Sequence, residues 1–253
     1  MSTPASTKTI GIIHHLSSSG GTVISRCLAS MPDVALLSEV HPTAAVPVGF
    51  FPIDPLGQFA ANYADLLPDE ERMYRAFRER VSAVADICAE RNKALVLRDH
   101  SHSDYLTHLF PKSRLVEALG QSFLLKRIVT MRHPIDSYLS MKASGFDVHL
   151  RSFDDYCQRV LRFLDDHTAL PLWRYEDFVA EPGKILKAMC EELGVGFDED
   201  WVHRFNTIKL TGDSGRRPDK ITPLPRRDTP PALIEEAAAS SAFVEIAQRL
   251  NYE

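Results

Sequence analysis

The 253-residue sequence has few cysteines, no long apolar run and no large excess of charge. Its four cysteines, Cys27, Cys88, Cys157 and Cys190, stand more than 30 residues apart, without the close CxxC pairs of zinc sites or the density of a disulfide scaffold. We therefore expect reduced thiols in a cytoplasmic protein. No stretch approaches the roughly 18 apolar residues of a membrane span, and the N-terminus lacks a charged-then-apolar signal pattern, so no membrane anchor is expected.

Positive charge is not in excess either. The chain has 29 Lys and Arg against 34 Asp and Glu, a net charge of −5, which argues against a protein that coats nucleic acid. One segment departs from this balance, because residues 204–227 hold seven Lys or Arg and two Asp, a net charge of +5. Its glycines and prolines predict a long basic loop over residues 204–230, which is either a lid over an anion or a solvated loop.

Strand-like runs alternate with helix-period runs along the whole chain. This alternation predicts one α/β domain over residues 1–253, with a mostly parallel central sheet flanked by helices. The expected strands are 9–14, 34–37, 94–98, 124–131 and 170–175, and the expected helices are 22–31, 68–91, 134–143, 153–165, 182–193 and 231–250. Residues 43–66 form an irregular excursion. Ligands of such sheets bind at the carboxyl ends of the strands, where polar residues occur here.

A Ser/Gly loop follows the first strand and reads Ser17, Ser18, Ser19, Gly20, Gly21 and Thr22. A strand, a short loop and a helix let successive backbone N–H groups wrap a phosphate or sulfate. The loop lacks the Lys of the G-x-x-x-x-G-K-[ST] motif. The alternative is an ordinary turn in which Ser19 caps the helix.

The end of the fourth strand carries a second anion motif, with Arg132 followed eight residues later by Ser140. On these residues the chain resembles sulfotransferases that use 3′-phosphoadenosine 5′-phosphosulfate (PAPS), in which an Arg and a Ser at this spacing hold the 3′-phosphate. The Ser17–Thr22 loop is similar to that family's 5′-phosphosulfate loop. The stretch WRYEDFVAEP at 173–182 resembles its Tyr-Glu-Asp-Leu segment.

The resemblance spans residues 9–182 and implies a sulfotransferase-type variant of the P-loop fold. It further implies an enzyme that transfers a sulfuryl group from PAPS to a hydroxyl or amine and releases 3′,5′-bisphosphoadenosine (PAP). The loop at 211–217, with Arg216 and Arg217, stands where the family closes over the nucleotide. At Ser18 the family usually has a Lys or Arg that balances charge on the leaving phosphate, and Arg26 and Arg98 are both candidates to supply it.

A general base for the acceptor is the remaining requirement. Glu39 is the first candidate, because Glu-Val-His at 39–41 is similar to the stretch that carries the catalytic Glu in glucosaminyl sulfotransferases; an ordinary surface or capping Glu is the alternative. His100 is the second, with Asp99 available to orient a neighbouring imidazole. No His/Cys/Asp/Glu cluster has metal-ligand spacing, and residues 99–102 are expected to be extended, which would not place both histidines on one helix face. We therefore predict that no metal is required.

Two other functions stay open on the sequence. A P-loop kinase or nucleotide hydrolase would need a Lys on the phosphates and an acidic residue holding Mg²⁺. A nucleotide-binding protein without transferase activity is suggested by Ser18. The acceptor, a small molecule or a glycan, would fill a pocket built by the 43–66 excursion; lipids, aryl alcohols and sugars remain possible, and the oligomeric state is open.

Overall fold

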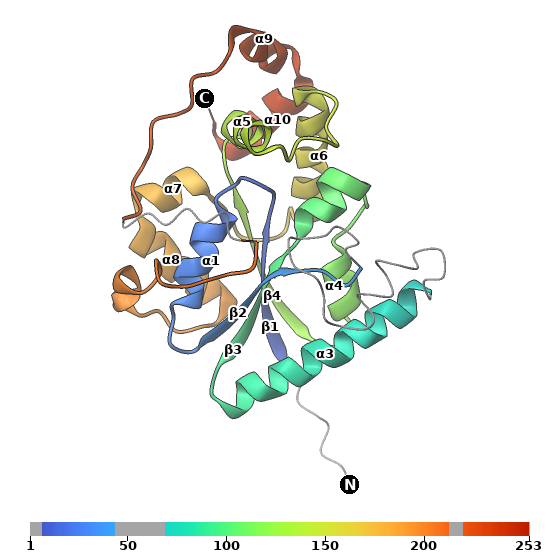
Figure 1. Cartoon of the computed structure of the whole chain (residues 1–253), viewed down its shortest axis with the longest axis vertical. Helices are drawn as coiled ribbons and strands as arrows, with labels where there is room; N and C mark the ends of the chain where they lie inside the picture. Colours follow the sequence, from blue (N-terminus) through green and yellow to red (C-terminus); the bar gives the residue numbers. More distant parts are fainter. Residues whose placement is uncertain (1–6, 44–68, 213–219, 253) are drawn as a thin grey trace.

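A central parallel sheet organises the computed structural model, which describes residues 7–43, 69–212 and 220–252. Its strands are β1 (Thr9–His15), β2 (Val34–Val40), β3 (Ala94–Asp99), β4 (Leu124–Met131) and β5 (Leu172–Arg174). They lie in the order β2-β3-β1-β4-β5, and every neighbouring pair is parallel (Figure 1). The predicted α/β class with a parallel sheet is confirmed.

The helices differ from the sequence prediction at several points. They are α1 (Gly21–Ala29), α3 (Glu70–Glu90), the π-helix η2 (Ser103–His108), α4 (Arg114–Leu119), α5 (Pro134–Ser144), α6 (Phe153–Asp166), α7 (Tyr175–Ala180), α8 (Pro182–Leu193), the 3₁₀-helix η3 (Glu199–His203), α9 (Pro231–Ala239) and α10 (Ser241–Leu250). The expected helix 231–250 is two helices, because Ser240 caps α10 by accepting from Phe243 N. The expected strand 170–175 ends at Arg174.

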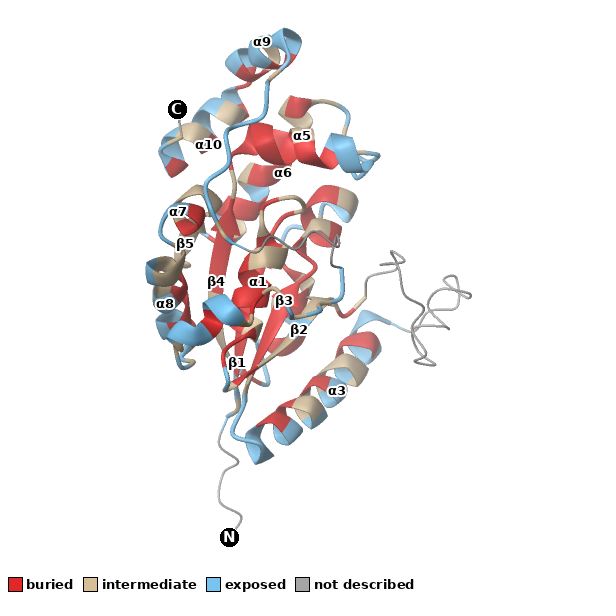
Figure 2. Ribbon diagram, turned by 60° about the vertical axis from the view of Figure 1, so that its left-hand side comes forward, coloured by how far each residue is buried: buried red, intermediate tan, exposed pale blue. Residues whose placement is uncertain are grey.

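The two faces of the sheet are covered by different helices, as the period-two alternation of strand side chains requires. Ile10 and Ile12 of β1 face the apolar cluster that includes residues of α3 and α4. Ile13 faces the opposite cluster, which includes residues of α1 and α8. Figure 2 shows the buried strands between these layers. This three-layer core fixes the carboxyl ends of the strands in space.

A third apolar cluster lies beyond the carboxyl ends of the strands. It joins Val129 and Met131 of β4 to Phe153, Tyr156 and other residues of α5, α6, α9 and α10. These helices form the upper part of the molecule in Figure 1.

Three further predictions concern the cysteine thiols, membrane anchoring and the two irregular segments. The four cysteines are buried and unbridged. Within the described ranges, no helix combines the length and apolar character needed to cross a bilayer. Residues 44–66 of the predicted excursion, as well as Arg216 and Arg217, lie outside the described residues.

Candidate functional site

The loop after β1 contains two residues with left-handed backbone angles just before α1. Ser18 (φ 62°) and Gly20 (φ 85°) both adopt left-handed backbone angles. Gly20 is the N-cap of α1 and makes no side-chain capping bond, while Ser19 Oγ donates to the carbonyl of Leu16 at 2.7 Å. Ser19 therefore does not cap the helix, and no side chain occupies the N-terminus of α1 as its cap.

Both loop glycines are in close contact with aromatic rings. A Cβ on Gly20 would stand 2.2 Å from the ring of Tyr175, and one on Gly21 would stand 2.4 Å from His15 Nδ1. The guanidinium carbon of Arg132 lies 5.3 Å from the centroid of the same Tyr175 ring. The loop, the Arg132 turn and the Tyr-Glu-Asp segment thus meet around one side chain.

The rest of the Tyr-Glu-Asp segment supports the turn between β4 and α5. Glu176 Oε1 accepts from the backbone N–H of His133 at 2.9 Å, and its Oε2 accepts from the hydroxyl of Tyr252 at 3.0 Å. Arg174 makes two hydrogen bonds to Asp177. This segment therefore positions the residues that follow Arg132. The second predicted anion ligand, Ser140, is buried within α5.

Arg98 connects the ends of β1 and β2. Its Nε donates to His15 Nε2 at 2.6 Å and its Nη1 to Ser38 Oγ at 2.9 Å, and its Nη2 lies 2.6 Å from Glu39 Oε1. Because His15 Nε2 accepts, its Nδ1 carries the proton that is donated to the Leu16 carbonyl at 2.9 Å. Burial, reinforced by Arg98, holds the pKa of His15 well below its usual value, so this ring is neutral.

Glu39 is a buried carboxylate at the end of β2. Its side chain is 4% exposed, its φ is 59°, and a Cβ on Gly212 would stand 2.4 Å from its Cγ. Burial raises the pKa of Glu39 to about 7, an effect that the opposing charge of Arg98 only partly offsets and that Asp99 reinforces. A carboxyl group that titrates near neutrality is suited to proton transfer.

His100 and Asp99, although adjacent in sequence, have different hydrogen-bond partners. His100 Nδ1 pairs with Ser103 Oγ at 2.6 Å, and its Nε2 lies 3.5 Å from Glu39 Oε2. Burial, with the neighbouring His102 and His41, lowers the pKa of His100 to about 2. Asp99 Oδ2 instead pairs with His14 Nδ1 at 2.7 Å and accepts from two serine hydroxyls. Asp99 thus orients His14 rather than His100.

The structure brings a third side chain, that of His102, close to Glu39 and His100. Glu39, His100 and His102 each offer a ligand atom within 4.8 Å of the other two, and the rings of His100 and His102 are 3.6 Å apart. The chain turns into a helix at Ser101, so the extended conformation assumed from the sequence is wrong.

The described ends of the basic loop contact both parts of the site. On one side, Ser38 Oγ donates to the carbonyl of Thr211 at 2.8 Å. On the other, Arg226 Nη2 lies 2.9 Å from His133 Nδ1, and its Nε lies 3.4 Å from Asp136 at the start of α5. Tyr175 belongs to the predicted Tyr-Glu-Asp segment, whereas the sequence gives no functional role to Arg226 or His102, which the fold brings to the site.

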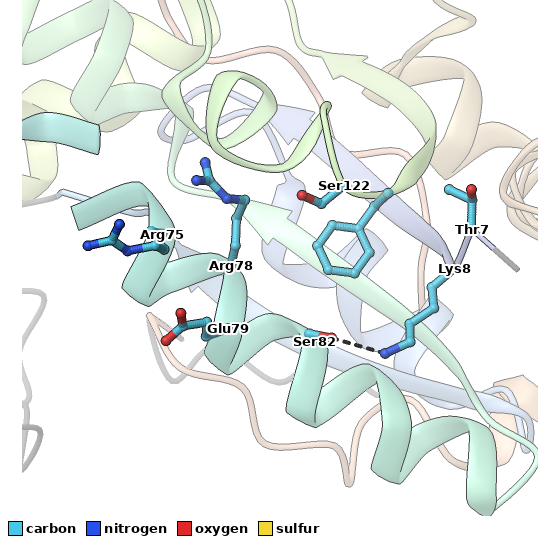
Figure 3. Close-up of a pocket in the computed structure, with 8 residues that line it drawn as sticks. Thr7, Lys8, Arg75, Arg78, Glu79, Ser82 and Ser122 are labelled. Atoms are coloured by element: carbon cyan, nitrogen blue, oxygen red, sulfur yellow. Dashed lines mark hydrogen bonds between the residues drawn. The ribbon is translucent and has the colours of Figure 1, made fainter. Parts of the chain in front are cut away.

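A separate pocket of about 420 Å³ opens at the amino edge of the sheet (Figure 3). It is lined by Thr7, Lys8, Arg75, Arg78, Glu79, Ser82, Ser122 and Phe123. Lys8 is paired with Asp86 and donates to Ser82 Oγ, and Arg78 is paired with Glu71. This pocket lies at the opposite edge of the sheet from the loop, and two of its cations already have partners.

Solved sulfotransferase structures are similar to this chain in fold. The sulfotransferase domain of the Synechococcus PCC 7002 olefin synthase matches with a TM-score of 0.57 and 20% identity, over 99% of this chain and 98% of that one. The sulfotransferase domain from the curacin biosynthetic pathway matches with 0.54 and 19%, over 98% and 99%. The Alicyclobacillus acidocaldarius sulfotransferase matches with 0.50 and 17%, over 95% and 93%. No family model and no curated protein matches the sequence. The chain has the fold of a sulfotransferase.

Proposed function

We propose that this protein is a PAPS-dependent sulfotransferase that acts on a hydroxyl or amine. The observation that carries the proposal is the meeting of Gly20, Arg132 and Tyr175 beside an α1 N-terminus with no side-chain cap. A helix N-terminus and a neighbouring Arg attract the anionic groups of a nucleotide. The fold shared with solved sulfotransferases supports the same function.

The proposed donor site uses backbone groups and four side chains. The Ser17–Thr22 loop binds the 5′-phosphosulfate through its N–H groups, while Arg132 and Ser140 hold the 3′-phosphate. Arg216 and Arg217 of the basic loop close over the nucleotide, a role that the contact of Arg226 with the start of α5 supports.

Transfer then needs an in-line acceptor, a base and charge stabilisation of the leaving phosphate. Glu39 removes the acceptor proton, supported by its burial and a pKa of about 7. His100, beside its second oxygen, is the other candidate base. Arg98 is favoured over Arg26 as the substitute for the missing loop cation. Arg98 contacts both His15, at the end of β1, and Glu39, whereas Arg26 lies in the last turn of α1.

Thermal unfolding with PAP, compared with ATP and Mg²⁺, tests the cofactor class. A ligand at 100 times its Kd adds about 2.7 kcal/mol, and each kcal/mol moves the midpoint of a domain of this size by roughly 2–4 °C. We expect PAP to raise the midpoint by roughly 5–11 °C. Arg132→Ala abolishes this rise, whereas Arg91→Ala, a change at an exposed cation, preserves it.

The other outcomes identify the alternatives. A rise with ATP and Mg²⁺ alone rejects the sulfotransferase proposal in favour of a kinase or hydrolase. A rise with PAP but no PAP release from PAPS over a panel of alcohols, sugars and amines favours a non-catalytic nucleotide-binding protein. Gain of turnover in Ser18→Lys would then attribute the inactivity to the missing loop cation.

A further inference from the structure

Three buried ligand atoms on the acceptor side face one another without hydrogen-bond partners. They are Glu39 Oε2, His100 Nε2 and His102 Nδ1, each unpartnered among the described residues. A buried polar atom left without a partner costs about 1–3 kcal/mol. The proposed transfer needs only one proton acceptor, so it does not account for a carboxylate and two imidazoles at the same point. The three residues each offer one ligand atom within 4.8 Å of the other two, a spacing that permits them to hold one metal ion.

The donor set is the one that Zn²⁺ prefers. Two imidazoles and one carboxylate, with a fourth position open, form a common three-ligand zinc site. Two ligands that each stand about 2.1 Å from a tetrahedral ion are about 3.4 Å apart. Glu39 Oε2 and His100 Nε2 are 3.5 Å apart. These two atoms can therefore bind one ion with little rearrangement. His102, which offers a ligand atom within 4.8 Å of those of Glu39 and His100, supplies the third ligand.

Hydrogen bonds to the opposite atoms orient the ligands. His100 Nδ1 pairs with Ser103 Oγ at 2.6 Å, which directs Nε2 toward Glu39. Arg98 Nη2 lies 2.6 Å from Glu39 Oε1, which leaves Oε2 for the ion. Outer contacts of this kind fix ring and carboxylate orientation at metal sites. The positive charge of Arg98 also weakens the hold on a dication, so we expect reversible binding.

The neighbouring His41 is already committed elsewhere. Its Nε2 pairs with Asp104 Oδ1 at 2.8 Å, and its Nδ1 accepts from the backbone N–H of Thr43 at 3.1 Å. With both ring nitrogens engaged, His41 does not ligate. The site therefore has three protein ligands, one from the end of β2 and two from the turn after β3.

We propose that Glu39, His100 and His102 bind one Zn²⁺ reversibly and that the bound ion inhibits sulfuryl transfer by occupying the base. The inhibition rests on the proposed function, whereas the metal binding does not. An ion on Glu39 Oε2 and His100 Nε2 occupies both candidate bases at once. The same residues thus serve as base when the metal is absent and as ligands when it is present.

Cobalt titration of the full-length, metal-stripped protein tests the binding. Co²⁺ reports coordination through its visible absorption, and Zn²⁺ is then added to displace it. We expect one equivalent to bind, with affinity lowered at least 10-fold in His102→Gln and unchanged in His149→Gln, a substitution at an exposed histidine. Circular dichroism melting verifies the fold of each variant. If His102→Gln does not fold, Glu39→Gln provides the second loss-of-ligand variant.

Zinc inhibition of PAPS turnover tests the consequence. Equimolar Zn²⁺ should lower turnover, a chelator should restore it, and His102→Gln should need at least 10-fold more Zn²⁺ for the same inhibition. Absence of saturable Co²⁺ absorption, or binding that is equal in wild type and both ligand variants, overturns the proposal. Retained turnover with the site saturated overturns the inhibitory role. Metal binding in a protein that neither binds PAP nor turns over PAPS leaves the zinc site standing and rejects the proposed function instead.

Discussion

The two halves of the proposed site differ in what fixes their shape. In the proposed nucleotide half, the Ser17–Thr22 loop packs against Tyr175 and Arg132, and backbone angles and close packing define the shape. In the proposed acceptor half, which consists of Glu39, Arg98 and the histidines after β3, contacts between buried ionisable groups define it. Changes in the first half should alter binding and stability, and changes in the second should alter chemistry.

The largest expected effect comes from a change in the acceptor half alone. Glu39→Gln keeps the size of the side chain but removes the proton acceptor, and loss of a general base typically costs 10²–10⁴-fold in rate. We expect a turnover loss of about 10²–10⁴-fold with the PAP-induced rise in unfolding midpoint retained. Turnover assays with a chelator present and PAP thermal shifts measure the two quantities.

The control for this change is Glu245→Gln, which removes an exposed carboxylate that pairs with Arg249. It should leave turnover within twofold. Equal turnover in Glu39→Gln and wild type would remove Glu39 from the reaction. Loss of PAP binding together with turnover would mean that the two halves are not separable.

The next largest effect comes from a change in the nucleotide half. Gly20→Ala places a methyl group 2.2 Å from the Tyr175 ring at a φ of 85°. The left-handed backbone costs roughly 1–2 kcal/mol and overpacking 1–3 kcal/mol, so we expect a loss of roughly 2–5 kcal/mol in unfolding free energy together with loss of the PAP shift. Denaturant unfolding and PAP thermal shifts measure these effects.

Two other glycines separate the backbone cost from the steric one. Gly145 has φ 70° but nothing within 4 Å of an added Cβ, so Gly145→Ala should show only the left-handed cost. Gly183 has open space and no positive φ, so Gly183→Ala should be close to neutral. If Gly20→Ala is no worse than Gly145→Ala, the loop is not fixed by its contact with Tyr175.

The same division explains what the sequence could predict. Local patterns specified the sheet, and the expected bounds of β4 and α8 match the structure. The loop glycines were identified because a strand, a Ser/Gly turn and a helix are contiguous in sequence. Period-two and period-3.6 patterns are local properties, so they do not require knowledge of the fold.

The acceptor half required the lateral order of the strands. Parallel registers set Ile13 beside Arg98 and Val40 beside Asp99, and these pairings bring the end of β2 to the end of β3. Glu39 and His100 were chosen separately as alternative bases, but their proximity follows only from this register. The helical conformation that begins at Ser101 differs from the extended conformation predicted for residues 99–102, so the position of His102 is not predicted from the sequence.

The pH profile distinguishes the two candidate bases. Glu39 must be ionised to accept a proton and its pKa is about 7, so kcat/KM should fall tenfold per pH unit below 7 and level off above it. His100, with a pKa of about 2, is already neutral throughout this range. Metal-free assays from pH 5 to 8 measure the profile. A flat profile would assign the base to His100 rather than Glu39.

The smallest expected effect concerns the support of the nucleotide half. Tyr252→Phe removes the hydroxyl that donates to Glu176 Oε2 at 3.0 Å, while Glu176 Oε1 still accepts from His133 N–H beside Arg132. A hydrogen bond to a charged group contributes about 1.5–3 kcal/mol, and the partly exposed position of Tyr252 lowers this to about 1 kcal/mol. We expect Tyr252→Phe to lose about 1 kcal/mol of unfolding free energy, measured by denaturant unfolding, and to reduce PAP affinity less than tenfold.

Tyr74→Phe is the control for this change. The Tyr74 hydroxyl lies 3.5 Å from Glu117 Oε2, which is a long hydrogen bond, so this variant should lose less stability and no PAP affinity. Equal effects of the two changes on PAP affinity would show that the Tyr-Glu-Asp segment does not position the Arg132 turn.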